Sequence, residues 1–416
     1  MNGLITRAVL KNMTALYLFQ GLNYLLPLII IPYLVRVLGL EVFGILMFVT
    51  AFIIIGRVWV AFGFDLTATR LVALYGRERH AELSRLLADV VAVRLVLLFV
   101  FAVVCVSLFA VIPQFREHMP LLLFGLLILA GEALLPVWLF QGLERMPPIV
   151  WIRAGARVGN LALVVAFVHG PEDVWLVPAF EALTIVCGSA VALAYAARSF
   201  KLWAVRPSSD RMLQLSQKGT AVFVANLSVQ LYTTLNMIVL GLIIGPVAVG
   251  AYAIAEKIYS AIRSLLSPFV QATFPGLSRS FDLDRTSFEA QYKTILYYLA
   301  WILIAVGIAL ALLSDLFVMI VAGARDQAAW ATLVVFACTM PFALGSFLSP
   351  MLVSRGLDRE LMRITIIGGV LGMVTCPPLA YFFDAPGAAA AVLIVQIYNS
   401  IALFVANKQS LVSLKT

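Results

Sequence analysis

The sequence predicts an all-α polytopic membrane protein with about twelve transmembrane helices in two six-helix lobes. Three observations predict this fold class. Hydrophobic residues make up 63% of the 416 residues and charged residues only 12%, roughly half the charged fraction of a soluble domain. Apolar runs recur from end to end, each near the ~20 residues with which a helix crosses a bilayer. Short motifs also repeat in the same order in the two halves of the chain.

The apolar runs set the expected order of the helices. The fifth run is short, and the eighth carries several charges. No small-residue cleavage site follows the first run, so we expect it to be a retained helix rather than a signal peptide. The runs lie roughly at residues 13–35, 43–64, 90–112, 120–141, 154–169, 175–197, 219–244, 248–275, 294–314, 329–353, 361–383 and 386–406.

Basic residues are distributed unevenly about these runs. Of the 29 Lys and Arg residues, 21 fall on the side of the predicted membrane that carries both termini, three on the opposite side and five inside the runs. Because cytoplasmic loops of membrane proteins are enriched in Lys and Arg, both termini are predicted to be cytoplasmic. The same loops account for the net charge of +8 without a nucleic-acid partner.

One repeated motif lies between neighbouring runs. Gly39–Gly44 separates the first run from the second, and Gly245–Gly250 separates the seventh from the eighth, at an offset of 206 residues. The same offset relates Arg57 to Arg263. We expect the glycines of both copies at tight turns.

A second motif ends the fourth and tenth runs. PVWLFQGLER at Pro136–Arg145 is similar to PMLVSRGLDR at Pro350–Arg359, at an offset of 214 residues. The copies are six runs apart, and this even number gives them the same membrane orientation. The repeat therefore predicts two lobes, residues 1–205 and 206–416, related by a pseudo-twofold axis along the membrane normal.

Several segments resemble those of a known family, and WLFQGLE is the most specific of them; the resemblance covers nearly the whole chain. In order they are Leu34–Gly39 with Phe43–Gly44, Gly63–Arg70, Pro136–Met146, Gly250–Ile258 and Phe274–Arg279. They resemble the bacterial O-antigen-type, Wzx-like flippases, in the polysaccharide-transporter branch of the multidrug/oligosaccharidyl-lipid/polysaccharide exporter superfamily.

The resemblance implies two six-helix lobes around a central cavity. It also implies alternating-access transport of an undecaprenyl-diphosphate-linked oligosaccharide from the cytoplasmic to the periplasmic leaflet of the bacterial inner membrane. The superfamily suggests coupling to a proton or sodium gradient, and other polysaccharide-assembly membrane proteins are candidate partners. We expect no catalytic residues, no metal site and no cofactor.

Three cations inside the apolar runs are candidates for binding the diphosphate, because arginine and lysine bind phosphate oxygens. Arg57 lies about 10 Å from the cytoplasmic end of its helix, so it either lines a cavity or snorkels to the interface. Arg263 is deeper, about 16 Å from the end, and shares a polar helix face with Glu256. Lys257 lies beside this face and is the third candidate.

Glu132, Glu181 and Glu256 are carboxylates at buried sequence positions. Each either balances the charge of an arginine or binds a coupling proton or cation, since an unpaired buried carboxylate has a raised pKa.

Polar residues supply two further sets of candidates. Amides in the first and seventh runs either bind sugar hydroxyls or join neighbouring helices, and charged residues at cytoplasmic helix ends form either a gate or exposed ion pairs worth ~0–1 kcal/mol. The amides are Gln20, Asn23, Asn226 and Gln230, and the gate candidates are Asp65, Arg70, Glu144 and Arg145.

Two other function classes fit the sequence less well. A membrane polysaccharide polymerase or glycosyltransferase needs a sizeable periplasmic loop, but the longest here, around residues 315–328, has about fourteen residues. A cation-coupled drug antiporter of the same superfamily would favour an acidic cavity, whereas Arg57 and Arg263 favour an anion. HExxH, GxSxG and P-loop patterns are absent from the sequence. The four cysteines lie in apolar runs without metal-type spacing, so we expect buried thiols.

Overall fold

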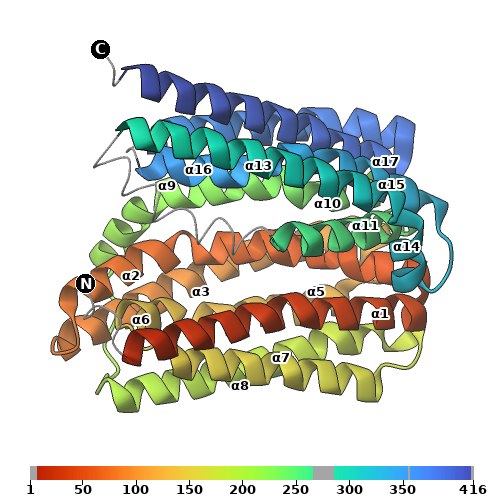
Figure 1. Ribbon diagram of the computed structural model, residues 1–416. Helices are drawn as coiled ribbons and strands as arrows, with labels where there is room; N and C mark the ends of the chain where they lie inside the picture. The colour runs from red at the N-terminus through yellow and green to blue at the C-terminus, as the bar shows by residue number, and fades with distance from the viewer. Residues whose placement is uncertain (1–6, 266–284, 355–356, 414–416) are drawn as a thin grey trace. The chain divides into compact units, whose positions relative to one another are not determined.

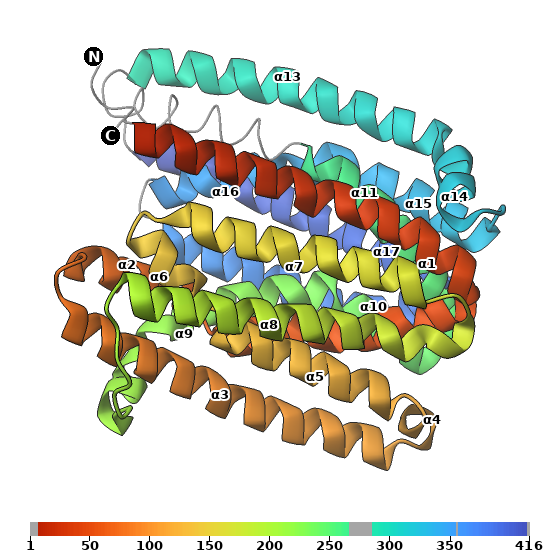
Figure 2. The same ribbon diagram turned by 90° about the horizontal axis from the view of Figure 1, so that it is seen from below.

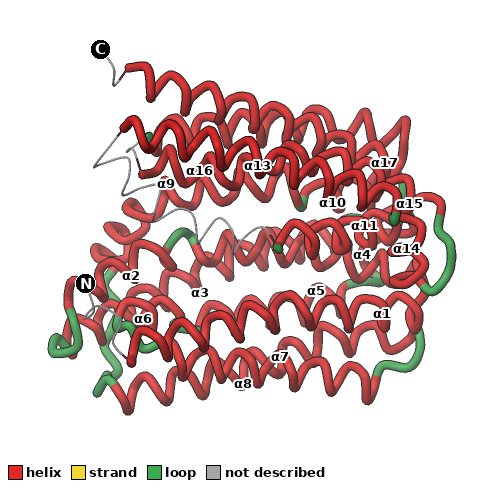
Figure 3. Tube along the Cα trace, in the orientation of Figure 1, coloured by secondary structure: helices red, strands yellow, loops and turns green. Residues whose placement is uncertain are grey.

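The computed structural model describes residues 7–265, 285–354 and 357–413, and these residues are almost entirely helical (Figure 3). In these ranges there is no β-strand. Eight helices of the described chain are long and apolar enough to cross a membrane, or nine if a pair bent by 41° counts as one span. The prediction of an all-α polytopic membrane protein is confirmed, whereas the count of twelve helices stays a prediction.

The helices follow the predicted runs in order (Figure 1). The first part of the chain forms α1 (Arg7–Ala61), α2 (Phe64–Tyr75), α3 (His80–Val111), α4 (Pro113–Arg116), α5 (Met119–Leu134), α6 (Val137–Gly142), α7 (Met146–Phe167), the 3₁₀ helix η1 (Pro171–Trp175) and α8 (Leu176–Ser199). The second part forms α9 (Ser209–Thr233), α10 (Leu235–Ile243), α11 (Pro246–Ser264), α13 (Arg285–Leu312), α14 (Ser314–Ala322), α15 (Gln327–Thr339), η2 (Met340–Leu344), α16 (Gly345–Ser354) and α17 (Asp358–Ser413).

Two long helices each contain two of the predicted runs. Helix α1 covers the first run and most of the second, and it turns at Gly39, where φ is 77°. Helix α17 covers the last two and is interrupted at Asp384, where φ is 58°. Both turns fall between the runs predicted from the sequence. The eighth run is described only as far as Leu265, and its remainder lies outside the described residues.

Helix α7 begins at Met146, eight residues before the predicted start of the fifth run at residue 154. Two prolines, Pro147 and Pro148, lie in its first turn. Proline is tolerated there because the amide that it lacks would have no partner within the helix. The sequence-based boundary was therefore wrong, and Arg153, which lies one residue outside the predicted run, is inside α7.

The contacts divide the chain into two compact units. The N-terminal unit comprises Met1–Gly39 and Val49–Leu227, and the C-terminal unit comprises Leu40–Phe48 and Ser228–Thr416. The predicted lobe boundary at residues 205 and 206 stays a prediction, and the contacts place the first part of α9 in the N-terminal unit. Within that unit α3 packs beside α5, and α7 packs beside α8 (Figure 2).

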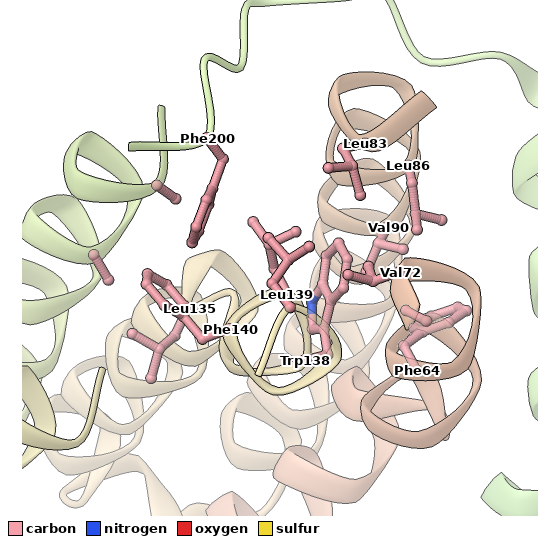
Figure 4. Close-up of a cluster of buried hydrophobic side chains, with 14 of the residues drawn as sticks. Phe64, Val72, Leu83, Leu86, Val90, Leu135, Trp138, Leu139, Phe140 and Phe200 are labelled. Carbon is pink, nitrogen blue, oxygen red and sulfur yellow. The ribbon is translucent and has the colours of Figure 1, made fainter. Parts of the chain in front are cut away.

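Each unit has an apolar core of its own. In the N-terminal unit Trp138, Leu139 and Phe140 of α6 are at most 1% exposed, and they pack with side chains of α2, α3 and the end of α8 (Figure 4). Two aromatic positions of the WLFQGLE motif, Trp138 and Phe140, are therefore explained by packing in the apolar core. A second cluster in the C-terminal unit contains Phe347 and Leu303, which are also at most 1% exposed.

The two copies of the glycine motif contact each other within the C-terminal unit. A Cβ atom on Gly44 would lie 1.9 Å from the carbonyl oxygen of Pro246, and one on Gly250 would lie 2.5 Å from the carbonyl oxygen of Leu40. Because Gly44 and Gly250, like Leu40 and Pro246, are 206 residues apart, the two contacts are reciprocal, as a local twofold axis requires. These two glycines allow close helix packing, whereas Gly39 and Gly245 have positive φ at the turns. Our expectation that all four glycines serve turns was therefore wrong for Gly44 and Gly250.

Candidate functional site

Arg57 of α1 forms ion pairs with two glutamates of the N-terminal unit. Its Nη2 donates a hydrogen bond of 2.8 Å to Oε1 of Glu181 on α8. Its Nε lies 3.1 Å from Oε1 of Glu132 on α5, as an ionic contact without hydrogen-bond geometry. The three side chains are 26–40% exposed. The contacts direct the guanidinium toward two other helices of its own unit.

Small residues next to these charges let the three helices approach one another. A Cβ atom on Gly56, which precedes Arg57, would lie 2.5 Å from Cδ1 of Leu129 on α5. A Cβ atom on Gly131, which precedes Glu132, would lie 2.8 Å from Cγ2 of Ile185 on α8. Small residues at such positions are typical of closely packed transmembrane helices. The glycines therefore help to bring one arginine and two carboxylates from three helices together.

Helix α7 adds two arginines that we had not proposed as site residues. Arg153, Arg157 and Asn160 follow at i, i+4 and i+7, so they share one face of the helix. Arg153 interacts electrostatically with Glu132 and Arg57, and Arg157 with Glu132, Glu181 and Arg57. The cluster of Arg57, Glu132, Arg153, Arg157 and Glu181, which we call the charge cluster, thus contains three arginines and two glutamates.

The sequence contained a signal for one of these arginines. Arg157 lies inside an apolar run, where a charged residue is a functional candidate by default. Arg153 could not be recognised in this way, because the late boundary of the fifth run assigned it to a loop.

Asp65 and Arg94 form a second ion pair of the N-terminal unit. Nη2 of Arg94 on α3 lies 2.6 Å from Oδ1 of Asp65 in the first turn of α2, and the side chains are 4% and 64% exposed. Glu132 and Arg153 also interact electrostatically with Asp65. Arg94 lies inside an apolar run, and we had not proposed it as a candidate. The structure therefore pairs Asp65 with a residue outside the set of gate candidates.

The structure describes the side chains of the remaining gate candidates and of two of the four amides. Arg70, Glu144 and Arg145 are exposed, and Glu144 has a φ of 53°. Asn226 is exposed on α9. Gln230 accepts hydrogen bonds from Thr233, the last residue of α9, and from Thr234, which precedes α10. The side chains of the last two candidates, Gln20 and Asn23, lie outside the described residues, and the gate and sugar-binding roles stay predictions.

The candidates of the C-terminal unit lie on the second half of α11. Nζ of Lys257 lies 3.0 Å from Oε2 of Glu256. Arg263 is partly buried and interacts electrostatically with Tyr232 of α9. Lys257 is therefore paired with its sequence neighbour in this structure, and its proposed role in diphosphate binding is untested, as is that of Arg263.

The cysteines differ from our expectation of four buried thiols. Cys105 and Cys376 are buried, whereas Cys187 and Cys338 are exposed. The prediction was wrong for the exposed pair because a position in an apolar run does not tell whether a side chain faces protein or the outer helix surface. In the part of the chain that is described, no group of three His, Cys, Asp or Glu side chains could hold a metal ion.

Comparisons of the sequence with known proteins identify related transport proteins. A family model described as "Polysaccharide biosynthesis protein" matches residues 9–281. Two relatives carry the name "Putative O-antigen transporter". The one from Escherichia coli K12 is 28% identical over 97% of this chain and 98% of its own length. The one from Shigella dysenteriae is 27% identical over 93% of this chain and 97% of its own length.

The fold is also similar to solved structures of transporters. One is the lipid II flippase MurJ in an inward closed conformation, with a TM-score of 0.74, 12% identity, and coverage of 97% of this chain and 89% of that chain. Another is a multidrug resistance MATE family transporter of the MOP superfamily in an inward-facing conformation. For this transporter the TM-score is 0.65, the identity 15%, and the coverage 94% of this chain and 99% of that chain. At these identities the likeness shows the fold alone.

Proposed function

Because the chain belongs to the polysaccharide biosynthesis protein family, we propose that it is a flippase for a lipid-linked glycan. The proposal names an undecaprenyl-diphosphate-linked oligosaccharide, such as an O-antigen repeat unit, as the substrate. Transport runs from the cytoplasmic to the periplasmic leaflet of the bacterial inner membrane. The names of the two relatives, which match nearly the whole chain, support a substrate of this class.

The physical task of such a protein is to carry a charged, hydrated head group through hydrocarbon. The lipid tail can stay in the bilayer, so the cost falls on the diphosphate and the sugars. A charged group in a low-dielectric medium needs an opposite charge or hydrogen-bond partners. The protein must therefore offer cations, inside the membrane, that can pair with a diphosphate.

The charge cluster is the observation that carries this proposal. Its three arginines exceed its two glutamates, so the cluster has an excess of positive charge among apolar helices. Arginine presents a planar set of donors that fits phosphate oxygens in a bidentate manner. The cluster therefore favours an anionic substrate over the cationic substrates that an acidic cavity would attract.

The two glutamates have a role of their own in the proposed cycle. Without substrate, Glu132 and Glu181 form ion pairs with Arg57, and these pairs reduce the free-energy cost of keeping a guanidinium among apolar helices. An incoming diphosphate competes with them for Arg57, while Arg153 and Arg157 supply additional positive charge. When the diphosphate leaves, the glutamates form their ion pairs with Arg57 again. This competition favours release of the substrate over tight binding.

The matched position of the repeat, Arg263, is the proposed diphosphate ligand of the C-terminal unit. Coupling to a proton or sodium gradient is part of the proposal for Glu132, Glu181 and Glu256. Carboxylates within predicted apolar runs support it, because ionisable residues at such positions commonly mark ion pathways.

Complementation tests this function. A strain that lacks the protein is supplied with wild type or with variants in which Arg57 or Arg263 is replaced by Ala or Lys. We expect wild type to restore the surface glycan, each Ala variant to fail at a normal protein level in the membrane, and each Lys variant to restore part of it. Surface glycan at the wild-type level in both Ala variants would contradict the proposed arginine roles.

A further inference from the structure

Asp89 is a buried carboxylate that the proposed transport cycle does not use. It lies on α3, and its side chain is 2% exposed. Its Oδ1 accepts hydrogen bonds from the backbone amide of Ser208, at 2.9 Å, and from Nη2 of Arg211, at 3.1 Å. Its Oδ2 accepts a further bond from Nε of Arg211. A buried carboxylate with three donors is a firm attachment point, and all three donors come from the segment that follows α8.

Two more side chains of α3 bind the same segment. Nδ1 of His80 donates to the carbonyl oxygen of Phe200, at 2.8 Å. Oγ of Ser84, which is 2% exposed, accepts from the backbone amide of Trp203, at 3.2 Å. The segment from Phe200 to Ser208, which we call the connector, is therefore attached to the first turns of α3 at three places.

Apolar packing reinforces these attachments. Phe200 is 6% exposed and belongs to the apolar cluster of the N-terminal unit (Figure 4), and Leu202 packs against that cluster. Between them Lys201 has a φ of 52°. A residue with a Cβ atom adopts this left-handed backbone at an energetic cost, and it persists only where its surroundings hold it.

The first half of α9 packs within the N-terminal unit as well. Leu215 is 7% exposed and belongs to the same apolar cluster. A Cβ atom on Gly219 would lie 2.5 Å from the carbonyl oxygen of Phe62, and the rings of Phe62 and Phe223 stack with centroids 4.4 Å apart. After the connector, the chain passes from the N-terminal unit to the C-terminal unit between Leu227 and Ser228, inside α9.

We propose that Asp89 and Arg211 form a latch that fixes the connector to α3, so that the connector and the first half of α9 behave as a rigid part of the N-terminal unit. A loop of nine residues between two helices would ordinarily be the mobile joint of a two-unit protein. Here the joint lies outside the connector, in α9 near Leu227 and in α1 at the Gly39 turn and near Phe48, where the chain passes between the units.

Hydrogen exchange on the full-length protein in lipid nanodiscs tests the latch without any substrate. We expect the amides of Trp203 and Ser208 to be protected in wild type, and Asp89→Asn to speed exchange at Ser208 at least tenfold. Arg211→Gln, which removes the partly exposed partner, should act in the same direction if Asp89→Asn does not fold. The matched control is Asp210→Asn, at an exposed neighbour of Arg211, which should leave both amides unchanged.

Connector amides that exchange at unprotected rates in wild type, or that are unaffected by both latch variants, would overturn the proposal. The second readout is export of the glycan in the complementation strain. Here we expect a several-fold loss with Arg211→Gln at an unchanged protein level, and no loss with the control. A loosened connector combined with wild-type export would show that the latch has no part in transport.

Discussion

Nη2 of Arg57 lies 2.8 Å from Oε1 of Glu181, a residue 124 positions further along the chain. With Glu132 on the other side of the guanidinium, one cation is shared by two anions. In the absence of a ligand, such an arrangement lowers the cost of a charged residue at membrane depth. It also means that any anionic substrate that binds Arg57 has to compete with two carboxylates that belong to the protein.

Removal of one carboxylate should therefore strengthen anion binding. We expect Glu181→Gln to bind inorganic pyrophosphate several-fold more tightly than wild type, as measured by the thermal shift of the purified protein in detergent over a range of pyrophosphate concentrations. Export of the glycan should fall, because a substrate that binds more tightly in the ground state leaves more slowly. Glu172→Gln, at an exposed residue of η1, is the control. Unchanged or weaker pyrophosphate binding in Glu181→Gln would contradict the competition.

Variants of Arg57 should distinguish its effect on the stability of the protein from its effect on glycan export. Arg57→Ala leaves Glu132 and Glu181 close together without their shared cation. Breaking a fully buried pair costs ~3–5 kcal/mol, and we expect about 1–2 kcal/mol here because the partly exposed side chains are screened by solvent. The triple variant with Glu132→Gln and Glu181→Gln should regain the melting temperature of wild type but not export. If the triple variant exports glycan, Arg57 has no direct role in transport.

The arginines of α7 should contribute to anion affinity. We expect Arg157→Gln to weaken pyrophosphate binding about tenfold, which corresponds to ~1.4 kcal/mol, and Arg157→Lys to weaken it less. The matched control is Arg198→Gln at the exposed end of α8. Equal affinities for wild type, Arg157→Gln and the control would place Arg157 outside the anion site.

The reciprocal glycine contact makes a prediction about packing. Gly44→Ala and Gly250→Ala should destabilise the protein to a similar extent, because each adds a methyl group against a backbone carbonyl of the other motif. Overpacking of this kind costs about 1–3 kcal/mol. Gly155→Ala on α7, where a Cβ atom would meet nothing within 4 Å, should be neutral or slightly stabilising. Thermal unfolding in detergent measures all three, and a neutral Gly44→Ala would argue against the close contact.

Composition and the repeat predicted most of the fold, because both depend on patterns that the membrane imposes on sequence. Long apolar runs predicted the helices, and the repeat predicted that the segments around Gly44 and Gly250 are equivalent, which their reciprocal contact supports. The start of α7 was wrong because Pro147 and Pro148 resemble a loop in sequence but fit the first turn of a helix. That error also hid Arg153.

The candidate site was only partly predictable. A charged residue in an apolar run is visible in any sequence, so Arg57, Glu132 and Glu181 could be chosen. Which of these residues contact one another depends on the packing of helices that are far apart in sequence. Small residues such as Gly56 and Gly131 permit that packing, but the sequence does not show which helix each of them faces. The pair of Asp89 and Arg211, 122 residues apart, had no sequence signal, because each residue alone resembles an ordinary charge near a helix end.

The leaflet in which the lipid-linked glycan accumulates tests the central claim most directly. Membrane vesicles of defined orientation, from cells that lack this protein, are probed with a lectin or glycosidase that cannot cross the bilayer. If the protein is a flippase, we expect the undecaprenyl-diphosphate-linked oligosaccharide to accumulate on the cytoplasmic face in its absence. The oligosaccharide should appear on the periplasmic face again when wild type is supplied, but not when Arg57→Ala is supplied. The same distribution between the two faces with and without the protein would contradict the claim.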